Sequence, residues 1–157
     1  TGSVTLSPDL IDTAGVLNVG SSSGIIATVG TNATSGYSLS ISGLRGGLAT
    51  STGTGVNLIA SVGIGANAST AVATGTDNYG AQATSTVVAV TINPRYDKWN
   101  FTTLTVAAIA SSTTQVIANT ALPGTSSTTV KIFATADSAQ AADSYTDTIT
   151  LTAITLP

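Results

Sequence analysis

Short stretches of this chain alternate apolar and polar residues with a period of two, which is the spacing of a β-strand that buries one face. The clearest stretch is 145–154, in which Tyr145, Ile149 and Leu151 fall on one parity and the threonines at 146, 148, 150 and 152 occupy the other. Side chains of one parity point to the same face of a strand. The sequence therefore predicts a strand over 145–154 with its apolar face buried, and from its charge we expect Asp147 on the exposed face.

Comparable runs of Val, Ile, Thr, Leu and Tyr recur between Gly, Ser, Asn and Pro residues that favour turns. The runs that we expect to form strands are residues 4–6, 15–19, 24–29, 37–42, 56–62, 70–74, 83–93, 101–106, 128–135 and 145–154. Helix signals are few: the alanine-rich residues 134–143 could form one or two helical turns, but they carry no apolar stripe, and a loop is an equal alternative. Roughly nine or ten strands with little helix predict an all-β fold, a single antiparallel β-sandwich of the Ig-like or jelly-roll-like kind.

The domain organisation follows from the length and from the places where strand signals are weak. A chain of 157 residues fits one domain with a single core. Gly, Ala, Ser and Thr fill residues 43–55 and 63–80, which we expect to be long hairpin connections or weakly specified edge strands. We assign residues 9–157 to the sandwich domain and treat residues 1–8 as a separate strand.

Residues 1–8 are predicted to form a short strand that a proline separates from the sandwich. Hydroxyl and apolar residues alternate up to Pro8, with Val4 and Leu6 on the apolar parity. Such a strand can complete the sheet of a neighbouring subunit, because its backbone supplies hydrogen bonds while Val4 and Leu6 fill alternate pockets and set the register. A head-to-tail contact of this kind does not close on itself and builds a filament. The alternative is that residues 1–8 pair within their own domain.

The residue types that most enzymes use for chemistry are missing. The chain contains no His, Cys, Glu or Met. Without an imidazole, neither a Ser-His-Asp nor a Cys-His arrangement can move a proton. Nothing in the spacing of the seven Asp residues selects a catalytic pair of carboxylates, and most of them stand beside turn-forming residues, where Asp caps the backbone. We therefore expect a protein that is not an enzyme.

The remaining candidate sites are for a metal ion or for glycans. Calcium is the one metal that suits this composition, because carboxylates, amide side chains and carbonyl groups are its ligands. None of the Asp spacings reproduces a calcium loop, so we expect no cofactor and no metal site, with calcium as the open alternative. Three Asn-x-Ser/Thr sequons, at Asn32, Asn67 and Asn100, are candidate glycosylation sites.

The charge balance limits the classes of binding partner and the cellular locations that we expect. Four basic and seven acidic residues give a net charge of −3, the wrong sign for binding nucleic acid. No apolar run approaches the roughly 18 residues of a membrane span, and four basic residues are too few for a polybasic membrane patch. The lack of Cys fits either a reducing compartment or an exported protein, and the charged fraction of only 7% favours an extracellular or cell-surface location. Because the first residues have no basic start or apolar run, we expect an exported precursor to be longer than this chain.

Residues 93–101 gather the unusual side chains, including the one Trp. One interpretation is an exposed contact surface in which Tyr96, Trp99 and Phe101, with Arg95 beside them, form a platform for a glycan or a host protein. The other is that Trp99 and Phe101, which share a parity, fill one end of a core otherwise made of small side chains. We favour the second interpretation, because a chain with so few large side chains can hardly leave its Trp exposed.

Two segments resemble known surface proteins. Residues 31–43, Thr-Asn-Ala-Thr-Ser-Gly-Tyr-Ser-Leu-Ser-Ile-Ser-Gly, resemble the strand entry T-x-A-T-x-G-Y-x-L-x-I-x-G of Thr/Ser-rich secreted β-sandwich proteins of Patescibacteria, a candidate phylum of small-genome bacteria. The closing residues 144–152 are similar to the closing strand of those proteins, and also resemble the last strand of bacterial pilin and filament subunits. The resemblance implies a role at the cell surface or in a filament and brings no catalytic residues.

The resulting expectation is an extracellular structural subunit that assembles with copies of itself into a pilus-like filament or a surface layer by donating residues 1–8. The alternative is a β-sandwich adhesin or binding module that recognises a glycan or a protein through Tyr96, Trp99 and Phe101. Exposure of Trp99 would favour the binding module, and its burial the structural subunit.

Overall fold

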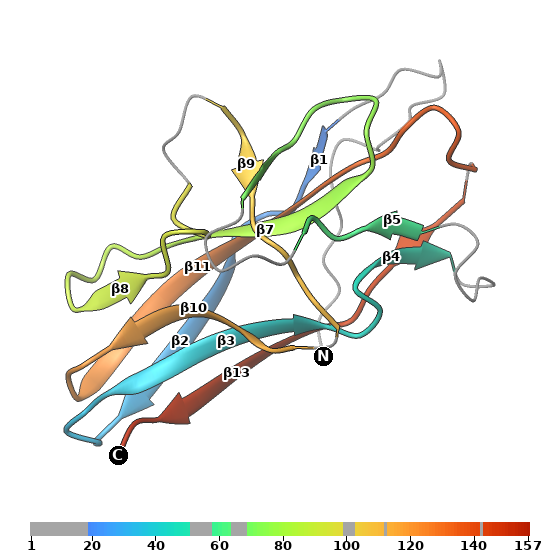
Figure 1. Cartoon of the computed structure of the whole chain (residues 1–157). Helices are drawn as coiled ribbons and strands as arrows, with labels where there is room; N and C mark the ends of the chain where they lie inside the picture. The colour runs from blue at the N-terminus through green and yellow to red at the C-terminus, as the bar shows by residue number, and fades with distance from the viewer. Residues whose placement is uncertain (1–18, 51–57, 64–68, 99–102, 112, 142) are drawn as a thin grey trace.

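The computed structural model describes residues 19–50, 58–63, 69–98, 103–111, 113–141 and 143–157, and across these residues it contains β-strands and turns but no helix (Figure 1). Several antiparallel sheets pack together in the manner of a β-sandwich. This confirms the predicted all-β fold class.

The described residues form thirteen strands, more than the roughly nine or ten expected from the hydrophobic pattern. In chain order the strands are β1 (Val19–Ser21), β2 (Ile25–Thr31), β3 (Tyr37–Gly43), β4 (Gly47–Thr50), β5 (Leu58–Ala60), β6 (Thr70–Ala71), β7 (Asn78–Thr84), β8 (Val90–Ile92), β9 (Thr105–Val106), β10 (Gln115–Thr120), β11 (Gly124–Thr135), β12 (Tyr145–Thr146) and β13 (Ile149–Thr155).

The first sheet is organised around β11, the longest strand. β2 pairs with the first half of β11 and β1 with its last residues, while β7 pairs with its second half. Thr129 and Val130 each pair with a residue of β2 and with a residue of β7, so β2 and β7 lie on opposite sides of β11. Among the described strands β11 is the one partner of β2, which makes β2 an edge of this sheet.

The second sheet has the strand order β13-β3-β10-β8, with all neighbours antiparallel. Seven consecutive residue pairs join β13 to β3 without interruption, whereas the register between β10 and β3 shifts between Val116 and Ala118. Because of this bulge, Ile117 and Ala118 are both fully buried although they are adjacent in sequence. β13 and β8 are the outer strands of this sheet.

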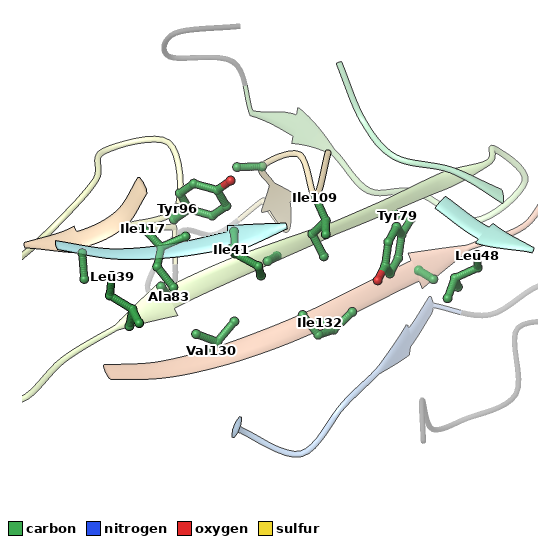
Figure 2. Close-up of a cluster of buried hydrophobic side chains, with 14 of the residues drawn as sticks. Leu39, Ile41, Leu48, Tyr79, Ala83, Tyr96, Ile109, Ile117, Val130 and Ile132 are labelled. Carbon is green, nitrogen blue, oxygen red and sulfur yellow. The ribbon is translucent and has the colours of Figure 1, made fainter. Parts of the chain in front are cut away.

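The inner faces of the two sheets enclose the main core. β3 contributes Tyr37, Leu39 and Ile41 at alternate positions, and Val130 comes from β11 in the opposite sheet (Figure 2). The alternation arises because every second side chain of a strand points to the same face. The Tyr37 hydroxyl reaches across to the first sheet, where it lies 2.6 Å from Oγ of Ser126. The two buried hydroxyls therefore satisfy each other.

Two small sheets extend the sandwich. One has the order β12-β4-β5, and the other pairs β6 with β9. A second, smaller core gathers Val62, Val72 and Val106 around Phe133 of β11. Phe133 has the opposite parity to Val130, so it projects from the outer face of the first sheet. The β6/β9 pair and Val62, just after β5, therefore cover one end of that outer face, whereas Leu48 of β4 and Ile59 of β5 pack in the main core.

Strand predictions are confirmed where the apolar pattern has a clear period of two. Runs 24–29, 37–42 and 128–135 coincide closely with β2, β3 and the second part of β11. Residues 4–6 and 15–18 lie outside the described residues.

The predicted strand over 70–74 is only the two-residue β6, within the described residues the run 56–62 contains only β5, and two further predicted strands are each divided into two elements. The predicted strand over 83–93 is two elements, because β7 ends at Thr84 and β8 begins at Val90. The predicted strand over 145–154 is divided into β12 and β13, which belong to different sheets. The division falls at Asp147, whose hydrogen bonds turn the chain from one sheet to the other.

Candidate functional site

Most of the residues singled out in the sequence lie outside the described part of the chain. These are Val4 and Leu6 of the expected assembly strand, Trp99 and Phe101 of the aromatic cluster, and the sequon residues Asn67 and Asn100. The sequon residue Asn32 is exposed in the connection between β2 and β3. Of the aromatic cluster, the structure describes Arg95 and Tyr96.

Tyr96 is buried in the core, so its ring takes no part in an exposed platform (Figure 2). Its exposed fraction is 0%, and its hydroxyl donates a hydrogen bond of 2.6 Å to the carbonyl of Ala108. Its own carbonyl accepts a hydrogen bond of 2.9 Å from the backbone N–H of Ala83. Burial raises the pKa of the Tyr96 hydroxyl to about 12, opposed by the nearby charge of Arg95. Tyr96 therefore anchors the residues after β8 to the core.

Arg95 is half-buried beside this ring. Its guanidinium carbon lies 5.6 Å from the centroid of the Tyr96 ring, within the range of a cation–π contact. Nη1 donates a hydrogen bond of 2.6 Å to Oε1 of Gln115 on β10. Gln115 in turn donates from Nε2 to Oγ1 of Thr113 at 2.6 Å. Arg95 therefore connects the turn after β8 to β10, and its role is structural.

The buried tyrosines predict a loss of stability at high pH. The pKa of Tyr79 is raised by burial first, then by the charge of Asp147 and by the hydrogen bond to it, and the pKa of Tyr96 is raised to about 12. In the unfolded chain both hydroxyls ionise near pH 10. Above about pH 10 the unfolded state therefore binds fewer protons than the folded state, so the free energy of unfolding falls as the pH rises.

We expect the urea midpoint to be constant between about pH 8 and pH 9 and to fall from about pH 10 upward. Tyr96→Phe should have a lower midpoint at about pH 8, because it lacks the hydrogen bond to Ala108, and a weaker decline above about pH 10. The same decline in both proteins would show that Tyr96 does not contribute to the alkaline loss.

Asp147 is half-buried between β12 and β13, which corrects its expected place on an exposed face. Oδ1 accepts hydrogen bonds from the backbone N–H groups of Leu44 at 3.1 Å and Arg45 at 3.2 Å. It also accepts the N–H of Thr148 at 2.8 Å. Oδ2 accepts a hydrogen bond of 3.3 Å from the hydroxyl of Tyr79, a buried side chain of β7. One carboxylate therefore joins β7, the β3–β4 turn and the start of β13.

A second carboxylate, Asp77, organises the turn after β11. Its Oδ1 accepts the backbone N–H of Asp137 at 2.9 Å, and its Oδ2 accepts Nε2–H of Gln140 at 2.8 Å. Oε1 of Gln140 then accepts the hydroxyl of Tyr145 at 3.1 Å. Asp137 itself accepts the N–H of Ala139 at 2.7 Å, as expected for a carboxylate that caps a turn. These carboxylates serve the backbone and neighbouring side chains.

No group of three or more metal-ligating side chains comes together within the described ranges. A surface pocket of about 380 Å³ is lined by residues 45–46, 61–63 and 110–111. Its described lining combines one Arg and two Ser with glycines and small apolar residues.

The surface feature with a clear chemical capacity is a pair of neighbouring edge strands, β2 and β13. Each pairs on one side among the described strands, and the two contact each other where the sheets meet (Figure 1). Ile25, Ala27 and Val29 of β2 and Ile149 and Leu151 of β13 pack against the core but remain partly exposed. We call this region the β2/β13 seam.

The β2/β13 seam lacks the features that protect an edge strand from pairing. Neither β2 nor β13 contains a charged residue or a proline, and their ladders with β11 and β3 run without a bulge. An unprotected edge presents backbone N–H and C=O groups to any extended chain. The seam can therefore bind a further strand through backbone hydrogen bonds, with apolar side chains below it.

In the residues that the structure describes, no helix is long and apolar enough to cross a membrane. Comparison of the chain with protein-family models, with curated proteins and with solved structures found no match. The functional proposal therefore rests on the seam and on the residue pattern.

Proposed function

We propose that this chain is an extracellular structural subunit that assembles with copies of itself into a pilus-like filament or a surface layer, and that residues 1–8 of one copy provide a strand to another. The observation that carries the proposal is the β2/β13 seam, where two seven-residue edge strands without charge or proline border half-buried apolar side chains. Open edges of this kind are extended by strand addition.

The charge distribution supports assembly. A net charge of −3 and a charged fraction of 7% leave little repulsion between copies. Polar side chains on the outer face of the second sheet are mainly hydroxyls, including Ser38 and Ser42 of β3 and Thr150 and Thr152 of β13. A surface of this composition suits an exported protein that packs against itself, and the resemblance of residues 31–43 to secreted surface proteins points the same way.

The binding-module alternative has no observation in its favour among residues 93–98. Tyr96 has no exposed surface, and the guanidinium of Arg95 is engaged by Gln115 and the Tyr96 ring. The structural subunit is therefore the function that we propose.

Negative-stain electron microscopy of the purified protein tests this proposal. We expect filaments or a lattice from the full chain and dispersed particles from a variant that lacks residues 1–8, with the same far-UV circular dichroism for both. All strand pairings described for the two sheets join residues from Val19 onward, so an unchanged circular dichroism spectrum would show that the sandwich folds without residues 1–8. Dispersed particles from the full chain would contradict the assembly proposal.

Two matched double variants test whether assembly requires Val4 and Leu6 to fill pockets, or requires only that residues 1–8 are uncharged. Val4→Asp with Leu6→Asp places two charges on the apolar parity of residues 1–8, and Ser3→Asp with Thr5→Asp places the same two charges on the hydroxyl parity. We expect the first variant to lose assemblies, because burying an unpaired carboxylate is costly, and the second to keep them. Equal loss in both would contradict pockets that accept Val4 and Leu6.

A further inference from the structure

The seam contains two open edges, and they differ in what they present to an added strand. β13 pairs through all of its seven residues with β3, from Ile149 opposite Gly43 to Thr155 opposite Tyr37. No other described strand pairs with its opposite side, and β13 contains no bulge, charged residue or proline. An antiparallel strand can therefore add along the full length of β13.

The two faces of β13 have distinct chemistry. Ile149 and Leu151 point inward and pack partly exposed against the main core. Thr150 and Thr152 point outward and are exposed, in line with hydroxyl side chains of β3. A matching strand must therefore carry apolar residues on one parity and small hydroxyl residues on the other.

Residues 1–6 have this pattern. Gly2, Val4 and Leu6 share one parity, and Thr1, Ser3 and Thr5 share the other, with no charged residue among them. When Val4 and Leu6 face the core, the hydroxyl residues extend the outer face formed by Thr150 and Thr152.

We propose that β13 is the acceptor edge for residues 1–6 of a second copy, paired antiparallel with Val4 beside Leu151 and Leu6 beside Ile149. This inference rests on the proposed function, since it specifies the contact through which copies assemble. The same register places Thr5 beside Thr150, and it places Pro8 beyond the end of β13.

Neighbouring registers are less favourable. A slip of two residues in one direction places Leu6 beside Asp147, where an apolar side chain meets a carboxylate already engaged in hydrogen bonds. A slip of two in the other direction places Pro8 beside Ile149, inside the ladder, where proline has no N–H to donate. A slip of one residue turns Val4 and Leu6 to the outer face. The proposed register avoids all three conflicts.

β2 fits residues 1–6 less well than β13 does. The outward residues of β2 are Ile26, Thr28 and Gly30, so its outer face offers one hydroxyl between an exposed apolar side chain and a glycine. The outer face of β13 presents two consecutive hydroxyl positions, Thr150 and Thr152, before the exposed Ile154, so the proposed register places both Thr5 and Ser3 beside threonines.

The length of chain between the donated strand and β1 permits a contact between copies. Residues 7–18 span up to about 40 Å when extended, at about 3.3 Å per residue. This is about the length of β11, the longest strand, which has twelve residues. The strand can therefore leave its own sandwich and reach β13 of a neighbour, and the low net charge lets the neighbour approach.

Cysteine cross-linking tests the acceptor and the register, because the chain has no Cys of its own. Thr5→Cys protein is mixed with isotope-labelled Thr150→Cys protein, oxidised, and analysed by non-reducing electrophoresis and mass spectrometry. Directly opposite residues of antiparallel strands have Cβ atoms about 4.5–5.5 Å apart, close enough for a disulfide after a small adjustment. We expect the mixed dimer of labelled and unlabelled chains as the main product.

Two control partners for Thr5→Cys are Thr28→Cys on β2 and Thr152→Cys on β13, both exposed threonines in strands. A higher yield of mixed dimer with Thr28→Cys would overturn β13 as the acceptor. A higher yield with Thr152→Cys would overturn the register. If the double variant Thr5→Cys with Thr150→Cys forms a disulfide within one chain and the mixtures give no mixed dimer, the occupant is the chain's own strand and the second copy is overturned.

The same samples separate this inference from the proposed function. Filaments or lattices that form without cross-linking to Thr150→Cys would contradict the acceptor edge while leaving assembly intact. A lack of assemblies in every sample, with dispersed particles by electron microscopy, would contradict the proposed function itself.

Discussion

Replacing Gly36 with alanine should lower the free energy of unfolding by about 3–4 kcal/mol. The backbone of Gly36 has a φ of 76°, a left-handed conformation that costs a residue with a Cβ about 1–2 kcal/mol. An added Cβ would also lie 2.0 Å from the carbonyl oxygen of Thr120. That oxygen belongs to the backbone, so relief requires a strand to move, at a further cost of about 1–3 kcal/mol.

The position of Gly36 makes this movement costly. Its N–H donates a hydrogen bond of 3.0 Å to the carbonyl of Ala33, which closes the turn between β2 and β3. Its carbonyl accepts a hydrogen bond of 3.0 Å from the N–H of Leu156, just after β13. Thr120 is the last residue of β10. A shift at Gly36 therefore disturbs the connection between the two sheets and the end of β13 together.

Two other glycines provide matched controls for the same Gly→Ala change. Gly124 has a φ of 125° but nothing within 4 Å of an added Cβ, so its substitution reports backbone strain alone. Gly63 also has open space around the Cβ position and does not have a positive φ, so its substitution should change stability by no more than about 0.5 kcal/mol. We expect the order Gly36→Ala, Gly124→Ala, Gly63→Ala, from the largest loss to the smallest, in urea unfolding followed by circular dichroism. Equal losses for Gly36→Ala and Gly124→Ala would exclude the contact with Thr120.

The sequence predicted strands well where one face of a strand is covered and the other is open. In β3 the inward Tyr37, Leu39 and Ile41 alternate with serines, and in β13 the inward Ile149 and Leu151 alternate with threonines. The period of two in residue type reflects the difference between the two faces. For the same reason the pattern of residues 149–153 indicated a strand with one apolar face.

Strands covered on both faces, or interrupted by a bulge, were not predicted. All four residues of β4 are buried, and the five central residues of β7 are buried as well. Apolar and polar residues therefore do not alternate along these two strands. In β10 the bulge places Ile117 and Ala118 in the core one after the other, which breaks the period of two. These features depend on the tertiary structure and leave no local signal.

The structural roles of the polar residues could not be predicted from the sequence either. Leu44 and Arg45, which donate backbone hydrogen bonds to Asp147, are 103 and 102 residues away in the sequence. Burial of Tyr96 depends on Ala108 and Ala83, which lie in other strands or turns. The charge of Asp147 suggests an exposed face although it shares the parity of Tyr145 and Ile149, and the structure half-buries it at the point where the strand breaks.

Replacing Asp147 with alanine should lower the free energy of unfolding by about 2–3 kcal/mol. The N–H groups of Leu44 and Arg45 are near the surface, where water can replace the carboxylate, so they account for the smaller part. The larger part comes from Tyr79, whose side chain is 1% exposed and whose hydroxyl is left without its acceptor. Asp147→Asn keeps an oxygen for the N–H groups and should lose about 1 kcal/mol.

A double-mutant cycle with Tyr79→Phe isolates the contact between the two side chains. Asp147→Ala should cost about 1 kcal/mol less in the Tyr79→Phe background than in the original protein, because phenylalanine has no hydroxyl to leave unsatisfied. We expect a coupling free energy of this modest size because the hydrogen bond between the Tyr79 hydroxyl and Asp147 is long, at 3.3 Å. The four proteins are compared by urea unfolding at a single pH near neutrality. Additive losses would show that Asp147 acts through the backbone of the β3–β4 turn alone, and the Tyr79 contact would then carry no stability.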